Sequence, residues 1–154
     1  MPRSPIALCA ALLLSLGATT MGAQVSSYEE NALRLESRLG DLQIVRGIQG
    51  TVVARAGVFR DPKVANLVSQ SEQALAEARV FERDYGPGQY AAALGIATLG
   101  AAIGASRIPD INAAIPSGLT AASFLLIAYG GSKLESAYRA LSRSIWFYNR
   151  DLKR

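Results

Sequence analysis

The sequence predicts an all-α protein in four parts, and three observations support this prediction. Residues 1–23 have the pattern of a secretory signal peptide. Two stretches of 22 residues each, 85–106 and 111–132, contain no charged side chain. Apolar residues recur at helical spacing on both sides of these stretches. The expected parts are a signal peptide (1–23), an extracytoplasmic helical hairpin (24–86), a two-helix transmembrane hairpin (87–132) and a basic amphipathic tail helix (133–154).

The composition of the 154-residue chain excludes several kinds of chemistry. Half of the residues are hydrophobic and 18% are charged, against about 25% in ordinary soluble domains. The chain has no His, and Cys9 is its only cysteine, which excludes imidazole catalysis and zinc sites built from Cys and His. No serine has a visible base to activate it. We therefore expect no enzyme activity, no cofactor and no metal.

The N-terminal segment has the three regions of a signal peptide. Arg3 supplies a positive start, Ile6–Leu16 is an apolar run, and Gly17–Ala23 is small and weakly polar. The apolar run is shorter than the roughly 20 residues that span a bilayer. Cleavage after Ala23 would leave a mature chain that begins at residue 24, and an uncleaved N-terminal anchor is the alternative. In both cases the next segment of the chain leaves the cytoplasm.

Two amphipathic helices are expected in the region after the signal peptide. The first covers 26–46, where Tyr28, Ala32, Leu35, Leu39 and Leu42 follow helical spacing. Residues 51–59 are ambiguous between strand and helix, and they are interpreted as a connector because no second strand is visible to pair with them. The second helix begins at Asp61 and Pro62, a good capping pair, and ends at 85–88. Residues 24–84 carry eight positive and nine negative charges, a balance that argues against a nucleic-acid site.

The two uncharged stretches are typical of a transmembrane hairpin. A short polar turn, Arg107–Asp110, joins them, and each stretch is long enough to cross a bilayer. The second arm holds more large apolar residues than the first, so the first is expected to insert together with its partner. The alternative is a pair of buried helices in a soluble bundle. A chain this short has too few other residues to surround two apolar helices.

Small residues in the first arm predict close helix packing. Gly100 and Gly104 form a GxxxG motif, and Ala97 extends the stripe toward the N-terminal end of the arm. Such a stripe lets two helix backbones approach each other closely. One interpretation is packing against the second arm of the same molecule, and the other is self-association between molecules.

The tail predicts an amphipathic helix with a regular apolar seam. Its members repeat at alternating spacings of four and three, as in a helix seam: Leu134, Tyr138, Leu141, Ile145, Tyr148 and Leu152. Six basic and two acidic residues leave the tail with a charge of +4. Contact with anionic lipid headgroups is therefore expected for Arg139, Arg143, Trp146 and Arg150. The alternative is a seam that packs on the preceding helices, with its basic residues solvated.

These features predict a small exported membrane protein that organises partners in the cell envelope. The expected partners are the lipid bilayer and a protein, or a second copy of the chain, bound through helices; no nucleic acid or small molecule is expected. The second candidate is a pore-forming or transport-accessory subunit assembled from Gly-rich helices. Export followed by two spans places both termini outside the cytoplasm, as in a bacterial inner membrane facing the periplasm. The positive-inside rule opposes this orientation, because it would place the basic tail inside.

Overall fold

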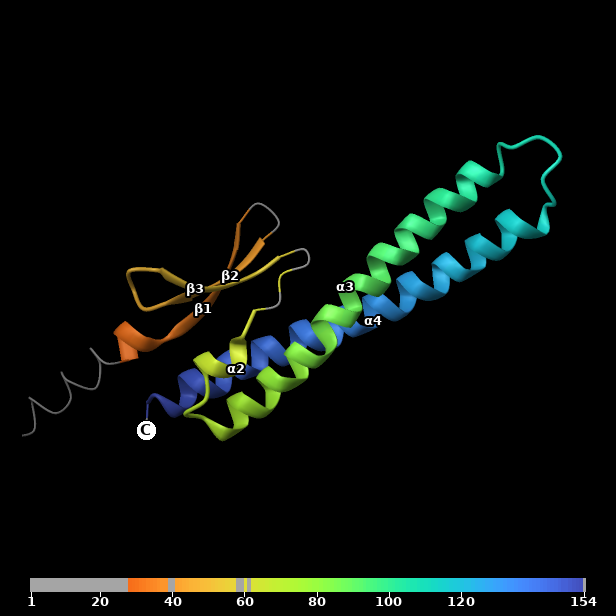
Figure 1. The fold of residues 1–154 in the computed structure, drawn as a ribbon. Helices are drawn as coiled ribbons and strands as arrows, with labels where there is room; N and C mark the ends of the chain where they lie inside the picture. The colour runs from red at the N-terminus through yellow and green to blue at the C-terminus, as the bar shows by residue number, and fades with distance from the viewer. Residues whose placement is uncertain (1–27, 39–40, 58–59, 61, 154) are drawn as a thin grey trace, which may run out of the picture.

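A computed structural model describes residues 28–38, 41–57, 60 and 62–153 of the chain. It is mostly helical, with two long antiparallel helices and one small sheet. The predicted signal peptide lies outside the described residues. The sheet lies against the end of the helical pair that holds the C-terminus, while the other end projects away from it (Figure 1). The elements are β1 (Leu33–Arg38), β2 (Asp41–Arg46), β3 (Thr51–Ala56), α2 (Val64–Leu67), α3 (Glu72–Ala105) and α4 (Ala114–Asp151).

The three strands form an antiparallel sheet in the order β1-β2-β3. Leu35 lies opposite Ile44, and Ile44 lies opposite Ala54, so apolar residues of all three strands share one face. That face packs on the helices, and Ile44 is completely buried. Gly47 and Gly50 close the turn between β2 and β3 with φ angles of 68° and 67°. Glycine adopts this left-handed conformation without steric cost, which is why the chain turns here.

The prediction of a helix over 26–46 is wrong. One helical turn at 28–31 is followed directly by β1 and β2. Leu33, Leu35, Leu42 and Ile44 alternate at the two-residue period of a strand, while part of the same set also fits helical spacing. The connector predicted at 51–59 contains β3, whose pairing partner is β2. Strand β2 lies within the range 26–46 that was expected to be helical, so no partner for β3 was recognised.

Helix α3 begins later than the sequence predicts. The Ser71 hydroxyl caps it by accepting a hydrogen bond from the Ala74 amide at 3.3 Å. The expected cap at Asp61 lies outside the described residues. Before α3, the short α2 buries Val64, and Val68 follows it into the same core.

Helix α3 continues through the segment that was expected to end it. Pro87 lies inside the helix, where its missing N–H removes one backbone hydrogen bond. Gly88 is buried against α4, so close that an added Cβ would lie 3.0 Å from the Leu134 side chain. This packing helps to offset the cost of the proline. The predicted boundaries at 86/87 and 132/133 therefore fall inside α3 and α4, and the tail is not a separate helix.

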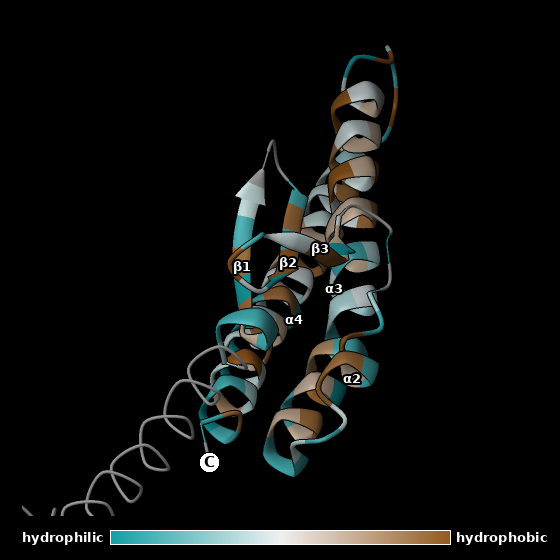
Figure 2. Cartoon of the chain, turned by 90° about the vertical axis from the view of Figure 1, so that its left-hand side faces the viewer, coloured by the Kyte–Doolittle hydropathy of each residue, from teal (hydrophilic) through white to brown (hydrophobic). Residues whose placement is uncertain are grey.

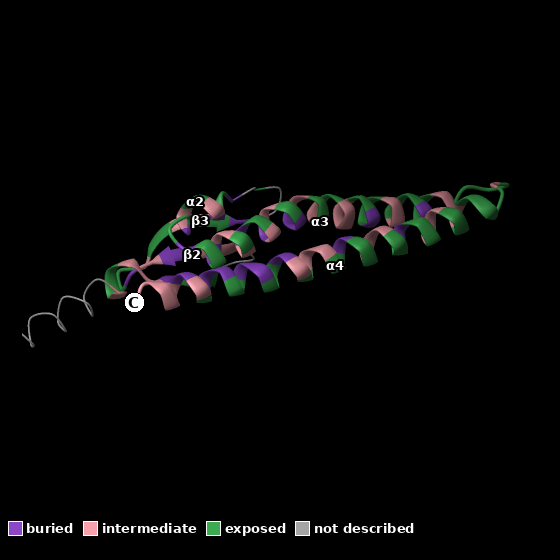
Figure 3. Cartoon of the chain, turned by 90° about the horizontal axis from the view of Figure 1, so that it is seen from below, coloured by how far each residue is buried: buried purple, intermediate pink, exposed green. Residues whose placement is uncertain are grey.

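The helical pair has two unlike halves. In the half beside the sheet, a core forms among the strands, α2, α3 and α4 around Phe81, Tyr85 and Leu141. In the projecting half, both helices carry large apolar residues that are exposed; Figure 2 colours many residues of these stretches as hydrophobic, and Figure 3 colours many of them as exposed. Those that are more than half exposed are Leu94, Ile96, Ile103, Ile115, Phe124 and Leu125.

Small residues form the contact between α3 and α4 in the projecting half. They recur every seven residues, as Gly88, Gly95 and Ala102 on α3 and as Ser123 and Gly130 on α4; Ala137 continues the α4 series into the half beside the sheet. An added Cβ at Gly130 would lie 2.5 Å from the Ala92 backbone nitrogen. The two backbones therefore approach each other closely, which is the packing that small residues allow between membrane helices.

Candidate membrane-anchoring site

Helices α3 and α4 are both long and apolar enough to cross a membrane. The uncharged stretch 85–106 has 22 residues, which at 1.5 Å per residue gives about 33 Å, the thickness of a bilayer core. In the most apolar 18-residue windows of the two helices, 17% and 11% of the residues are buried. A core helix of a soluble protein is mostly buried, so these two helices differ from that type. Length, composition and exposure together suggest membrane association.

Three hydroxyl groups in the projecting half bond to backbone carbonyls of their own helices. Thr98 donates to the Leu94 carbonyl at 2.8 Å, and Thr120 donates to the Pro116 carbonyl at 2.8 Å. Ser123 donates to the Thr120 carbonyl at 2.7 Å. A polar group in hydrocarbon needs such a partner, because no water is present to replace it. These side chains are therefore compatible with a lipid environment.

Two exposed tyrosines lie near the end of the projecting half that adjoins the sheet. Tyr90 on α3 is 64% exposed and Tyr129 on α4 is 54% exposed. Each lies within two helical turns of the charged residue that bounds its arm, Asp84 or Lys133. Tyrosines collect at this depth in membrane proteins, where the ring contacts hydrocarbon and the hydroxyl reaches the headgroups.

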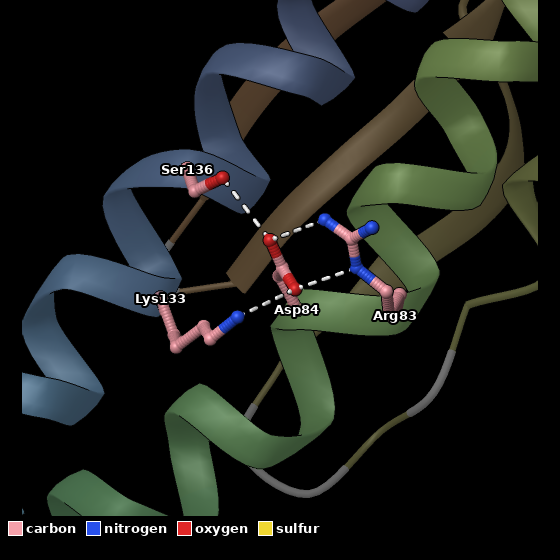
Figure 4. Close-up of polar contacts among 4 residues, drawn as sticks. All are labelled: Arg83, Asp84, Lys133 and Ser136. Atoms are coloured by element: carbon pink, nitrogen blue, oxygen red, sulfur yellow. Dashed lines mark hydrogen bonds and ion pairs between the residues drawn. The ribbon is translucent and has the colours of Figure 1, made fainter.

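A charged cluster closes the two arms at the same level (Figure 4). Asp84 is buried and accepts hydrogen bonds from Lys133 Nζ at 3.1 Å and from Ser136 Oγ at 3.1 Å, both across the gap to α4. Arg83 adds two more hydrogen bonds, at 3.0 and 3.2 Å. These bonds, with the one from Arg83 foremost, hold the pKa of Asp84 well below its usual range, although burial opposes the shift. Asp84 is thus ionised and fully partnered at the sheet-side end of the uncharged arms.

The small residues singled out from the sequence do not lie between the two arms. Gly100 and Gly104 are exposed, and an added Cβ at either would meet nothing within 4 Å. Ala97 is also exposed. The close contact is made by Gly95 and Gly130 instead, which the search for a GxxxG spacing missed. Their signal in the sequence is a seven-residue repeat of small residues along each helix.

The tail seam packs on the protein's own α3 and sheet. Leu141, Ile145 and Tyr148 are buried in the common core, while Leu134 and Leu152 are partly buried against it. Tyr138 is 42% exposed and makes an edge-to-face contact with the Tyr85 ring. Near the C-terminal end of α4, the Asn149 side chain exchanges two hydrogen bonds with the Leu33 backbone, at 2.8 and 2.7 Å. The tail therefore holds the sheet in place.

The residues expected to contact lipid headgroups lie on the C-terminal part of α4, which is continuous with the apolar arm. α4 is one helix from Ala114 to Asp151, so its tail continues along the direction of the apolar arm. Trp146 is 14 residues beyond Ser132, about 21 Å along the axis. A helix lying flat on the bilayer would need a bend after Ser132 that is not present.

The basic residues of the tail have partners within the protein. Arg139 pairs with Glu135, and Arg143 lies 3.8 Å from Glu77. Arg150 bonds to Asp151 at 2.8 Å and stacks over the Trp146 ring, 5.4 Å from its centroid. These contacts explain how a basic tail packs beside α3 without a lipid headgroup.

The described residues contain no group of three or more His, Cys, Asp or Glu that could hold a metal ion. Comparison with known proteins found no matching protein-family model, no matching curated protein and no matching solved structure.

Proposed function

We propose that the chain is a membrane-anchored scaffold. The projecting half of α3 and α4 inserts into the bilayer as a two-helix hairpin, and the sheet with the adjoining helix ends forms a head at the membrane surface. The head presents the sheet to a protein partner. Because the head packs directly on the membrane helices, the partner would be held at a fixed distance from the bilayer.

The observation that carries this proposal is the exposure of apolar side chains along the projecting half. Leu125 is 73% exposed, Ile96 is 65% exposed and Phe124 is 62% exposed, with nothing in the described chain to cover them. A soluble protein rarely exposes an apolar surface of this extent, which marks a membrane or protein contact. At the end of this surface near the sheet, tyrosines come first and charged residues follow, which is the order found from the hydrocarbon core to the headgroups of a bilayer.

The outer face of the sheet is a suitable surface for a protein partner. It carries polar side chains on the strands, among them Arg34, Glu36 and Arg55, which are exposed. The inner face of the sheet packs against the helices in the core. This division is the usual one for an antiparallel sheet with one solvated face.

A scaffold has more support than a pore. The hydroxyls of Thr98, Thr120 and Ser123 bond to carbonyls of their own helices, so they are not arranged as a polar path along the hairpin. Two helices also need several copies of the chain to enclose a channel.

The proposed orientation places the head and both termini outside the cytoplasm. The signal-like residues 1–23 support export of the segment after them. The bonds between Asn149 and Leu33 join the start of the sheet to the end of α4, so a hairpin that crosses twice leaves both on one side. Alkaline phosphatase fused after residue 154 should be active in a bacterial host. Fluorescence from a reporter that is active only in the cytoplasm, fused at the same point, would show that the orientation is the reverse of the proposed one.

Flotation with liposomes tests the membrane contact. Replacing Ile96 and Leu125 by Asp should abolish flotation, because each charge costs about 2.5–3.5 kcal/mol near the centre of a membrane helix. Ile48→Asp is the matched control, since Ile48 is 70% exposed but lies in the head, at the turn between β2 and β3. Its flotation should equal that of the wild type. Equal flotation of all three proteins would reject insertion of the hairpin.

A further inference from the structure

The seam between α3 and α4 repeats itself along the helix axis. Buried residues recur every seven positions, at Ala74, Phe81, Gly88, Gly95 and Ala102 on α3 and at Ser123, Gly130, Ala137 and Ser144 on α4. Nearly all of them are small. If α4 slid along α3 by seven residues, small residues would again face small residues over most of the length. In the projecting half, the seam therefore defines which faces meet but discriminates poorly between registers. In the half beside the sheet, the buried Tyr85, Leu141 and Ile145 are large and do not follow this repeat.

The cluster around Asp84 does not repeat. Asp84 is 3% exposed, and it receives Lys133 and Ser136 from α4. Sliding α4 by seven residues in one direction would replace these two partners by Leu126 and Tyr129. The opposite slide would bring Ala140 and Arg143. Asp84 would keep the two hydrogen bonds from Arg83 on its own helix. In the first slide it would lose both of its partners on α4, which is unfavourable for a buried carboxylate; in the opposite slide it would lose the Lys133 ammonium, and Arg143 would lie where Ser136 was.

Other side-chain pairs join the two helices near the C-terminal end of α4: Arg143 lies 3.8 Å from Glu77, Arg150 donates to Gln73 at 2.8 Å, and Ser71 donates to Asp151 at 2.6 Å. Asp84 differs from the charged members of these pairs in being buried. Ser144 Oγ donates to the Ala74 backbone carbonyl at 2.9 Å. Every turn of α3 offers a backbone carbonyl, so an equivalent bond can form after a slide. The pairing of Asp84 with Lys133, by contrast, needs one particular side chain on each helix.

We propose that the contact of Asp84 with Lys133 and Ser136 is a register lock. It selects one of several registers that the seam allows, and it thereby sets the height of the sheet relative to the apolar half. A slide by one repeat would shift α4 by about 10 Å along α3 and carry charged residues past the end of the uncharged arms. A single buried polar contact fixes register in coiled coils in the same way. This inference concerns the two helices and holds independently of the proposed membrane anchoring.

Distances between two spin labels measure the register in the full chain, with Cys9 replaced by Ser. One pair is Arg79→Cys with Leu125→Cys, and the other is Ile96→Cys with Ser142→Cys; all four positions are exposed. From the register of Asp84 and Lys133, the labelled residues are about 20 Å apart along the axis in the first pair and about 32 Å apart in the second. A slide changes the two separations by about 10 Å in opposite directions, whereas loosening of the helices broadens both.

The test variant is Asp84→Leu with Lys133→Leu, which removes the lock while keeping the site filled. We expect helix content and liposome flotation to stay at the wild-type level, while both label pairs acquire a second population with opposite shifts. Asp84→Asn with Lys133→Gln, which keeps a hydrogen-bonded pair, should retain the single population. Unchanged single distances in the Leu variant would overturn the lock. If that variant does not fold, Lys133→Met takes its place, and an unchanged single distance there is equally decisive.

Failure of the lock and failure of the anchor are separate results. The label distances report only how α3 and α4 are aligned, in detergent or in liposomes. Flotation of the same samples reports only whether the hairpin enters a bilayer. A protein with one register that does not float would reject the proposed function and keep the lock.

Discussion

Lys133 Nζ lies 3.1 Å from Asp84 Oδ1, and the two residues are the charged neighbours of the two uncharged stretches. Asp84 is the last charge before the first stretch, and Lys133 is the first charge after the second. Their pairing shows that the two arms lie side by side and that the start of the first is level with the end of the second. The two residues that bound the uncharged stretches in the sequence therefore lie side by side in the structure.

Removal of the Asp84 charge should destabilise the protein in a pH-dependent way. Asp84→Asn should cost roughly 1–3 kcal/mol at pH 7, as for a hydrogen bond to a charged group. The pKa of Asp84 is lowered in the folded protein, so its stabilisation is complete above the unfolded value near 4 and is lost as the pH falls. Thermal unfolding in detergent should therefore show a difference between wild type and variant that is largest at pH 7, smaller at pH 3, where the unfolded carboxyl is mostly protonated, and smaller still at lower pH.

The control for this experiment is Glu135→Gln, because Glu135 is exposed and its pairing partner Arg139 is exposed as well. Exposed ion pairs contribute about 0–1 kcal/mol, so this variant should melt close to the wild type at both pH values. If the deficit of Asp84→Asn is as large at pH 3 as at pH 7, the ionised carboxylate is not its source.

Neighbouring glycines on α4 should respond oppositely to the same substitution. Gly130→Ala places a Cβ 2.5 Å from the Ala92 nitrogen, and such overpacking typically costs about 1–3 kcal/mol. Gly131→Ala meets nothing within 4 Å and should be neutral or gain helix propensity, up to about 1 kcal/mol. Detergent denaturation followed by circular dichroism measures both. Equal effects of the two variants would contradict the observed seam.

Truncation of Leu141 should loosen the head. Leu141 is completely buried among α3, α4 and the sheet, and Leu→Ala at such sites costs about 2–5 kcal/mol. Limited proteolysis in detergent should cleave residues 28–84 faster in Leu141→Ala than in the wild type. Leu125→Ala is the matched control, because Leu125 is 73% exposed in the projecting half; it should leave the cleavage rate unchanged. Wild-type protection in Leu141→Ala would show that the tail does not hold the sheet.

The position of Trp146 distinguishes a tail packed on the head from a tail lying on the lipid. Trp146 is the only tryptophan in the chain, and it lies about 21 Å beyond the end of the uncharged arm along α4. Brominated lipids should therefore leave its fluorescence unquenched. In a Trp146→Phe background, Phe124→Trp provides a matched probe, because residues 124 and 146 are 62% and 60% exposed. That probe should be strongly quenched, and quenching of Trp146 itself would place the tail on the bilayer.

The sequence predicted the apolar hairpin because its signal is local. Two uncharged stretches around Arg107–Asp110 are visible without knowledge of any distant contact, and α3 and α4 contain most of each stretch. The sheet was missed because a strand is defined by its partner. Leu35 and Leu42 fit a helix as well as a strand, and only the pairing of Ile44 with Leu35 and Ala54 decides between them.

The packing residues were missed for a different reason. Gly100 and Gly104 lie four residues apart and match a known motif, but they occupy an exposed face of α3. Gly88 and Gly95 lie seven residues apart, a spacing that keeps both on the face toward α4. The contact face of an apolar helix depends on the helix that packs against it. A motif within one arm therefore does not identify the contact face.

Labelling of single cysteines from opposite sides of a membrane tests the central claim most directly. In a Cys9→Ser background, Arg107→Cys marks the turn between the arms and Ser142→Cys marks the head; both residues are exposed. In sealed vesicles that hold the protein in one orientation, a membrane-impermeant maleimide should label one of the two cysteines from outside, and the other only after detergent is added. Labelling of both cysteines from the same side of intact vesicles would contradict a hairpin that spans the bilayer.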